Sequence, residues 1–140
     1  MTTGLIIKTR TANIWLDELG IIHAVVNDDV ELTLDDAIEN VEGIKKVAKK
    51  VPVVVLSDIR NISSASKEHR NYFSSEKAAE VIGAVAMLIN SPLSKVLGNV
   101  FLKINKPPYQ GKLFTSENEA MEWLKMFIAT NSHNKQKEAL

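Results

Sequence analysis

The chain has 140 residues, of which 24% are charged and 45% hydrophobic, with 17 basic side chains, 17 acidic side chains and no cysteine. This length and composition favour one globular domain. The missing cysteines exclude disulfides, thiolate zinc sites and cysteine nucleophiles, and the balanced charge argues against a protein that binds nucleic acid. No apolar run reaches the roughly 18 residues of a membrane span. We therefore expect a cytoplasmic domain without membrane insertion.

The first thirty residues predict β-strands. Residues 5–8 form a short apolar run, residues 12–17 alternate in character, and residues 21–26 are rich in β-branched side chains. Glu18-Leu19-Gly20 is a turn signal between the last two segments, so we expect an antiparallel hairpin. His23 lies inside the second strand of this hairpin, and we interpret it as a structural histidine rather than a metal ligand.

A helix and a buried strand follow. Thr33 is a good N-cap, Asp36 stands at the capping-box spacing, and apolar residues then recur on one helical face up to Ala48. Residues 51–56 form an almost continuous apolar run, which is typical of a strand that is buried on both faces and parallel to a neighbour. Pro52 fits only at the start of this strand. We therefore expect a central parallel strand.

The rest of the chain alternates between helices and strands. We expect a polar loop over residues 57–65, a helix over 67–79 capped by Ser66, a strand over 81–89, a helix over 92–104 that begins with Ser91 and Pro92, a strand over 112–114, and a last helix with Trp123 on its apolar face. This order predicts an α/β fold, a mixed β-sheet with about four helices packed on it. We expect one domain over residues 1–130 and, because residues 131–140 show no apolar pattern, a disordered C-terminal tail.

The helix expected over residues 92–104 is apolar over more than one face, and Leu93, Leu97 and Phe101 belong to its stripe. An exposed stripe of this kind would be a liability. Three interpretations stay open. The last helix buries the stripe, or the stripe covers a pocket for a lipid or small apolar ligand, or it joins two copies of the chain in a homodimer.

No set of residues predicts catalysis, a metal site or a cofactor. The six glycines are scattered, so the sequence contains no Gly-rich phosphate loop. His69 lies near Asp58 and Ser66 in the sequence, but the strand–turn–helix context of a nucleophilic serine is missing. We interpret Asp28, Asp29 and the nearby Glu31 as a solvated turn rather than a metal site. We therefore expect a protein that is not an enzyme.

Two segments carry a resemblance to a known family. The segment from Leu56 to Ser66, LSDIRNISSAS, follows a buried strand and opens a helix, and it is similar to the signature of STAS domains, the family of anti-sigma-factor antagonists such as SpoIIAA. The end of the chain resembles the terminal segment of small bacterial SpoIIAA-like (STAS/CRAL-TRIO-related) proteins, through residues 105–109, 112–117 and 119–124. The resemblance spans about residues 5–128. It implies a SpoIIAA-like fold, and it implies a fold more than a function, because that group is largely uncharacterised.

The family's phosphorylated serine is the point at which this chain departs from the pattern. In anti-sigma-factor antagonists the serine follows an Asp at the start of the helix. With Asp58 aligned to the Asp that ends the family's strand, Ser66 takes the place of the second Asp and Lys67 that of the serine. A one-residue slip would instead put Ser66 at the serine and Ala65 at the acid. Either alignment degrades the motif, so we expect no phosphoserine switch.

The resemblance implies a non-enzymatic protein-interaction domain with a regulatory role. We expect an unidentified protein partner to bind the loop after the buried strand, through Asp58, Arg60, Asn61, Ser64, Ser66 and Lys67, with Arg60 and Asn61 as exposed donors. The alternative hypothesis is a protein that binds a lipid or a small apolar ligand. In that case the helix over residues 92–104 would be the lid, through Leu93, Leu97 and Phe101.

Overall fold

The computed structural model describes residues 2–139 and the side chains of residues 4–128. Its strands are β1 (Thr2–Lys8), β2 (Ala12–Asp17), β3 (Ile21–Val26), β4 (Glu31–Leu32), β5 (Val53–Asp58), β6 (Ser64–Ala65), β7 (Ile82–Leu88) and β8 (Gln110–Phe114). Its helices are α1 (Leu34–Val47), α2 (Lys67–Phe73), α3 (Glu76–Ala79), α4 (Pro92–Val100), the π-helical turn η1 (Phe101–Asn105) and α5 (Glu117–Ala139).

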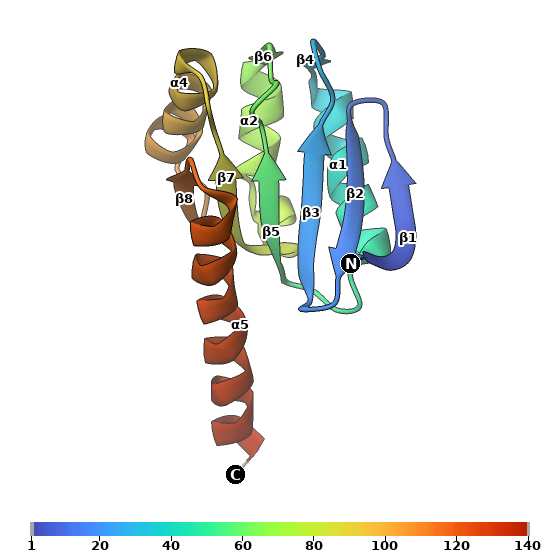
Figure 1. The fold of residues 1–140 in the computed structure, drawn as a ribbon, viewed down its shortest axis with the longest axis vertical. Helices are drawn as coiled ribbons and strands as arrows, with labels where there is room; N and C mark the ends of the chain where they lie inside the picture. Colours follow the sequence, from blue (N-terminus) through green and yellow to red (C-terminus); the bar gives the residue numbers. More distant parts are fainter. Residues whose placement is uncertain (1, 140) are drawn as a thin grey trace.

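Six strands form one mixed sheet in the order β1-β2-β3-β5-β7-β8 (Figure 1). The first three strands pair antiparallel, and β3, β5, β7 and β8 run parallel to one another. The short strands β4 and β6 form a separate parallel pair beyond one end of this sheet. The mixed sheet and the antiparallel hairpin therefore confirm the expected fold class.

The central parallel strand expected from the apolar run is β5. It lies between β3 and β7, is parallel to both, and buries Val53 through Leu56. Pro52 stands just before its first residue, and the Val51–Pro52 peptide bond is cis. The proline therefore takes the position expected of it, outside the hydrogen-bonded ladder.

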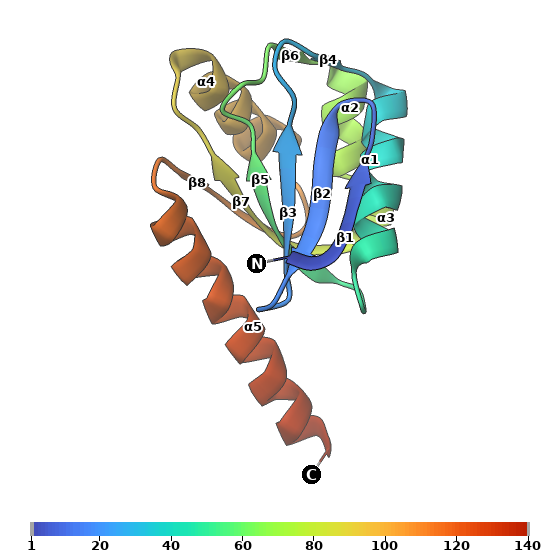
Figure 2. The same ribbon diagram turned by 45° about the vertical axis from the view of Figure 1, so that its right-hand side comes forward.

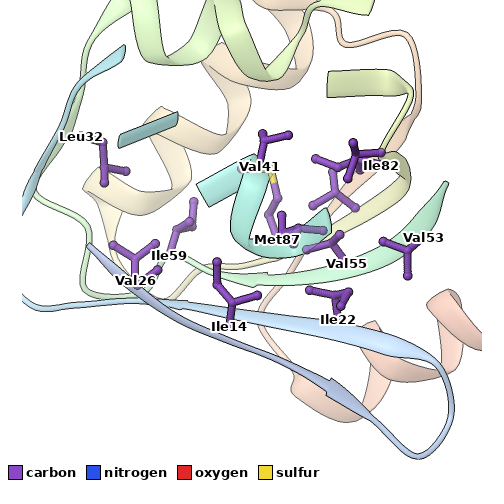
Figure 3. Close-up of a cluster of buried hydrophobic side chains, with 14 of the residues drawn as sticks. Ile14, Ile22, Val26, Leu32, Val41, Val53, Val55, Ile59, Ile82 and Met87 are labelled. Carbon is purple, nitrogen blue, oxygen red and sulfur yellow. The ribbon is translucent and has the colours of Figure 1, made fainter. Parts of the chain in front are cut away.

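Helices cover the two faces of the sheet unequally (Figures 1 and 2). Helices α1 to α4 lie on one face, and α5 lies alone on the other, packed on β5, β7 and β8. Figure 3 shows Ile14, Ile22 and Val55 of the sheet gathered near Val41 of α1 in the larger core. On the opposite face, the smaller core contains Leu124 of α5 packed among residues of the sheet.

Side-chain caps fix where the helices begin. Thr33 Oγ1 accepts from the backbone N–H of Asp36, and a carboxylate oxygen of Asp36 accepts from the backbone N–H of Thr33, which completes the predicted capping box of α1. Ser66 caps α2, and Ser91 caps α4 immediately before Pro92. Ser116 Oγ accepts from the Glu119 N–H at the start of α5. The caps expected from the sequence are therefore confirmed.

Two helices differ from the expectation. The single helix expected over residues 67–79 is two helices, because Ser75 Oγ donates to the carbonyl of Tyr72 and accepts from the N–H of Ala78, which starts a new helix. The helix expected over residues 92–104 changes to π-helical turns at Phe101 and ends at Lys106 in a left-handed conformation, with φ of 48°. The last helix, α5, runs from Glu117 to Ala139, and the expectation of a disordered tail stays a prediction.

Across residues 2–139, no helix combines the length and the apolar character that crossing a bilayer requires.

Candidate functional site

The carboxyl ends of four parallel strands meet at one edge of the sheet, at the upper end in Figure 1. The connections after β3, β5, β7 and β8 leave this edge and lead to α1, α2, α4 and α5. Ligands of open α/β sheets bind beyond the carboxyl ends of parallel strands. The predicted partner-binding loop follows β5 and therefore lies at this edge.

Asp58 and Arg60 form a paired unit at the end of β5. Asp58 Oδ1 accepts from Arg60 Nε at 2.9 Å and from the Arg60 backbone N–H at 3.1 Å, while Asp58 Oδ2 accepts from Arg60 Nη2 at 2.7 Å. The Arg60 side chain is 40% exposed and that of Asp58 13%. The hydrogen bonds to Asp58 raise the pKa of Arg60. The arrangement holds a permanently charged guanidinium in one orientation near the surface.

The other predicted residues lie on the same segment without forming a second cluster of this kind. Asn61, Ser64 and Lys67 are exposed. Ser66 is half-buried, and its Oγ accepts from the N–H of His69 at 3.1 Å as the N-cap of α2. The structure therefore pairs Asp58 with Arg60, uses Ser66 in helix capping, and leaves the remaining three polar side chains on the surface.

Bonds to a neighbouring connection hold this segment in place. Ser63 Oγ donates to the carbonyl of Val30 at 2.7 Å, and β6 pairs with β4. The backbone N–H of Ser66 donates to the carbonyl of Leu32 at 2.9 Å. These anchors belong to the connection between β3 and α1, so the two connections form one surface.

A cavity of about 100 Å³ lies between the sheet and the helices α1, α2 and α4. Most of its walls are apolar, including Val26, Val55 and Met87, and its polar neighbours include His69 and Arg70 of α2. The β5–α2 segment contributes Ile59, Ile62 and Ala65 to the same walls. This segment therefore has polar residues on the surface and apolar residues in the cavity.

The residues predicted as an apolar interface or lid divide between two positions. Leu97 and Phe101 line the cavity, whereas Leu93 is 46% exposed and does not. Val96 and Ile104 are also exposed, at 56% and 73%. The last helix does not bury this stripe, because α5 packs on the opposite face of the sheet. One of the three interpretations of the stripe is therefore wrong, and the ligand and homodimer interpretations stay predictions.

His69, noted in the sequence only for its nearness to Asp58 and Ser66, lines the cavity. Its Nδ1 atom is buried without a hydrogen-bond partner, and its ring packs on Phe73 with the centroids 4.9 Å apart. Burial lowers the pKa of His69 to about 4, so the imidazole is uncharged near neutral pH. The spacing of His69 and Phe73, one helical turn apart, was the available signal, but it does not reveal the cavity.

His23 and Asp17 form a polar pair that joins β3 to the end of β2. His23 Nε2 lies 2.8 Å from Asp17 Oδ2, and its ring stacks on Trp15 with the centroids 5.0 Å apart, so the interpretation of His23 as structural is confirmed.

Among residues 4–128, no group of three or more histidine, aspartate or glutamate side chains is placed to hold a metal ion.

Comparison with solved structures identifies the fold. An uncharacterised protein of the DUF3478 family from Shewanella loihica PV-4, whose crystal structure has a SpoIIAA-like fold, is similar to this chain with a TM-score of 0.51 and 18% sequence identity. The match covers 89% of this chain and 98% of that chain. At this identity the likeness concerns the fold alone, and the SpoIIAA-like fold that the sequence resemblance implied is confirmed.

Comparison of sequences gives the family. No curated protein matches this chain. A family model described as a domain of unknown function, DUF7793, matches residues 14–128, which run from within β2 into α5. The chain therefore belongs to the DUF7793 family of domains of unknown function.

Proposed function

We propose that this SpoIIAA-like domain is a protein-interaction module without enzymatic activity, and that its partner binds the surface of the β5–α2 segment. The observation that carries this proposal is the exposed Arg60 guanidinium, fixed by two hydrogen bonds to the Asp58 carboxylate, which also accepts from the Arg60 backbone N–H. A fixed side chain loses little conformational freedom when a partner binds it. It is therefore well suited to recognise an acidic or hydrogen-bond-accepting group on another protein.

The neighbouring side chains support the same surface. Asn61 and Ser64 offer exposed hydrogen-bonding groups, and Lys67 adds a second cation. The segment that carries them is bonded to the connection around Val30 and Leu32, so its backbone conformation is set before a partner arrives. Complementary charge chiefly raises the association rate and the specificity of such an interface. We expect the partner to present an acidic patch.

Binding to this surface would proceed without a phosphoserine switch. Lys67 is the first residue of α2 and has no hydroxyl, and the Ser66 hydroxyl oxygen already accepts the hydrogen bond that caps the helix. A phosphate would be favoured at a helix N-terminus, so phosphorylation of Ser66 is the alternative to be tested. Intact-mass analysis of the protein from its native host should find it unphosphorylated. Phosphate on Ser66, together with loss of partner binding in Ser66→Asp, would contradict this part of the proposal.

The partner surface can be tested with charge reversals at the two ends of β5. Arg60→Glu removes the fixed cation, and Lys50→Glu makes the same charge change at an exposed position that precedes the strand. Immobilised wild type and both variants are incubated with a lysate of the native host, and bound proteins are quantified by mass spectrometry. We expect a protein that wild type and Lys50→Glu retain equally and that Arg60→Glu retains at least tenfold less.

Circular dichroism must show that both variants are folded, and Arg60→Ala repeats the test without adding an acid next to Asp58. The proposal fails if every retained protein binds the Arg60 variants as well as it binds the wild type.

A second candidate function, the binding of a small apolar molecule, is favoured by the cavity that Leu97 and Phe101 line. Its volume of about 100 Å³ is below the roughly 150 Å³ of an apolar protein cavity that admits benzene. The cavity is therefore suited to a small ring or a molecule of similar size, and it is too small for a lipid.

A further inference from the structure

Exposed apolar side chains gather on two helices of the layer that covers one face of the sheet. Leu34 and Ile38 lie one helical turn apart on α1, and they are 40% and 39% exposed. On α4 and η1, the exposed apolar side chains are those of Leu93, Val96 and Ile104. Exposed apolar side chains that gather in one place are typical of interaction sites. Both helices therefore present a surface suited to contact with another molecule.

The two groups are accompanied by opposite charges. Residues 17–42 contain nine acidic residues and neither lysine nor arginine, whereas residues 91–116 contain four lysines and no acidic residue. Asp35 and Glu42 are exposed on α1, and Lys95 and Lys103 are exposed on α4 and η1. Among the described residues, none of these four side chains takes part in an ion pair. Their charges are therefore available to a partner.

We name the two surfaces by their helices. The α1 patch consists of Leu34, Asp35, Ile38 and Glu42. The α4 patch consists of Leu93, Lys95, Val96, Lys103 and Ile104.

The two patches lie on either side of α2. Helices α1, α2 and α4 cover the same face of the sheet, and α2 stands between the other two (Figures 1 and 2). On one side α2 packs against α1. On the other side Asn105 of η1 accepts from Arg70 Nε at 3.2 Å and donates to Asn71 Oδ1 at 2.8 Å. No residue of α2 is fully buried. The acidic and the basic patch therefore flank one central, accessible helix.

A second copy of the chain supplies the surface that each patch needs. A two-fold axis near α2 exchanges the two sides of the layer, so the α1 patch of one copy lies opposite the α4 patch of the other. The same axis forms the reverse contact at the same time. Each contact then joins apolar residues to apolar residues and carboxylates to lysines. Two α4 patches facing each other would instead oppose lysines, which is costly.

We propose that the chain forms a two-fold homodimer through its helical layer, in which the α1 patch of each copy packs on the α4 patch of the other. The outer side of α2 lies at the centre of this interface. The apolar residues stabilise the dimer by burial, and the charges set its orientation. The proposal goes beyond the partner surface around Arg60, which belongs to neither patch.

Charge reversals on the two patches test this arrangement. One double variant carries Asp35→Lys and Glu42→Lys, and the other carries Lys95→Glu and Lys103→Glu. Sedimentation velocity over a range of concentrations gives the mass and the dissociation constant. We expect wild type to reach twice the 15.5 kDa mass of the chain. Each double variant opposes like charges in both contacts, so its dimer should dissociate at least tenfold more readily.

Mixing the two double variants should restore the dimer. In the mixed dimer, the new lysines of one chain face the new glutamates of the other, and the second contact keeps its native charges. A chain that carries all four changes should also dimerise like wild type, because both of its contacts join reversed but opposite charges. Recovery of this kind depends on the pairing of the two patches and does not follow from a general effect of charge.

Matched controls separate the patches from the rest of the surface. Lys49→Glu with Lys50→Glu makes the same change of charge at exposed positions beyond the end of α1 and should remain dimeric. Ile104→Ser should weaken the dimer, whereas Leu19→Ser, at an exposed position between β2 and β3, should not. Circular dichroism must show that every variant is folded. Arg60→Glu should dimerise like wild type, so failure of the dimer and failure of the proposed partner surface are distinguishable.

Four results would overturn the proposal. The first is a wild type that stays monomeric up to about 1 mM. The second is a dimer that survives both double variants or that their mixture fails to restore. The third is a particle that grows beyond two copies with concentration, since the patches would then join head to tail. The fourth is a monomer that binds vesicles containing phosphatidylglycerol through Lys95 and Lys103, which would assign the α4 patch to a membrane surface instead.

Discussion

Asp36 connects two separate parts of the chain through one carboxylate. Its side chain is only 4% exposed and accepts hydrogen bonds from both Arg10 Nε, at 2.7 Å, and Arg10 Nη2. It also accepts from the backbone N–H and the hydroxyl of Thr33, both at 2.9 Å. The Arg10 bonds are the main cause that lowers the pKa of Asp36 to about 2. This carboxylate therefore fastens the turn between β1 and β2 to the beginning of α1.

Replacement of Asp36 by alanine should destabilise the fold by about 1–2 kcal/mol. The change removes the carboxylate of the capping box of α1, whereas Arg10, with 57% of its side chain exposed, returns to water without a large penalty. The exposed neighbour Asp35 is the control, and Asp35→Ala should cost less than about 1 kcal/mol. Urea denaturation at pH 7 gives both values. Equal losses in the two variants would show that the bonds of Asp36 contribute little.

The same carboxylate gives a defined acid dependence. Its pKa is depressed from 3.8 to about 2 in the folded protein, so the unfolded chain takes up the proton first as the pH falls. The stability that Asp36 contributes is thus complete above about pH 4 and is lost as the pH falls to 2. Wild type and Asp36→Asn should therefore converge in stability over this range. Parallel curves down to pH 2 would argue against a depressed pKa.

His69 should lower the free energy of unfolding as the pH falls from 6.5 to about 4, a range above the one in which Asp36 acts. Its pKa falls from 6.5 to about 4 on folding because of burial, with a smaller opposing effect of Asp36 and a further lowering by Arg70. Between these values the unfolded chain binds the proton and the folded chain does not. The contribution of neutral His69 is therefore complete above pH 6.5 and falls by about 3 kcal/mol as the pH drops to 4. The measurement is the free energy of unfolding in urea at several pH values, and His69→Leu should lack this slope. A slope equal to that of the wild type would refute the assignment.

At the scale of single elements, α5 is attached to the sheet through its first turns. Ala120 and Leu124 are fully buried, and Trp123 packs against Phe114 and Phe127 with ring centroids 5.6 and 4.7 Å away. Trp123 itself is half-buried. The helix therefore depends on an aromatic cluster at the side of the sheet as well as on its buried aliphatic residues.

Trp123→Ala should cost about 3 kcal/mol, at the lower end of the range for aromatic residues in a core, because the indole keeps partial exposure. Met126 is 63% exposed on the same helix, and Met126→Ala should cost less than about 1 kcal/mol. Thermal and urea unfolding measure the difference. A loss below about 1 kcal/mol for Trp123→Ala would mean that the ring contacts stabilise little, and the indole would become a candidate interface residue.

The inner and outer sides of α4 and η1 should respond oppositely to a charge. Phe101 is 7% exposed and lies in the core, so Phe101→Glu should prevent folding by burying an unpaired carboxylate. Val96 is 56% exposed, and Val96→Glu should leave a folded protein. Circular dichroism and size-exclusion chromatography distinguish the results. A folded Phe101→Glu protein would contradict the core position, and a wild-type dimer that Val96→Glu converts to monomer would support the homodimer hypothesis.

The elements that could be predicted are those specified by local chemistry. The helix starts at Thr33, Ser66 and Ser91 could be predicted because capping depends on neighbouring residues in the chain. The break between α2 and α3 was not predicted, since the apolar helical pattern continues through Ser75. The bond between Arg10 and Asp36 joins residues far apart in sequence, and no local pattern specifies it.

At the scale of the whole molecule, the alternation of strands and helices predicted the mixed sheet, because a continuous apolar strand such as β5 needs covered faces on both sides. The candidate site was predicted only in part. Arg60 and Asn61 were recognised as exposed donors from a polar loop, whereas the fixed pairing of Arg60 with Asp58 needs coordinates. The cavity and the orphaned His69 Nδ1 arise from the packing of several elements, so no single segment of sequence encodes them.

The alternation along β5 has a consequence for how the molecule unfolds. Val53 and Val55 belong to the core beneath α1, while Val54 and Leu56 belong to the core beneath α5. Because one strand supplies both cores, loss of β5 from the sheet removes packing from both layers at once, and the domain should behave as one cooperative unit. In Trp15→Phe, the fluorescence of Trp123 reports on the α5 layer, and far-ultraviolet circular dichroism reports on all helices and strands. The two urea transitions should share one midpoint and one slope, whereas an earlier fluorescence transition would show that α5 detaches as an independent layer.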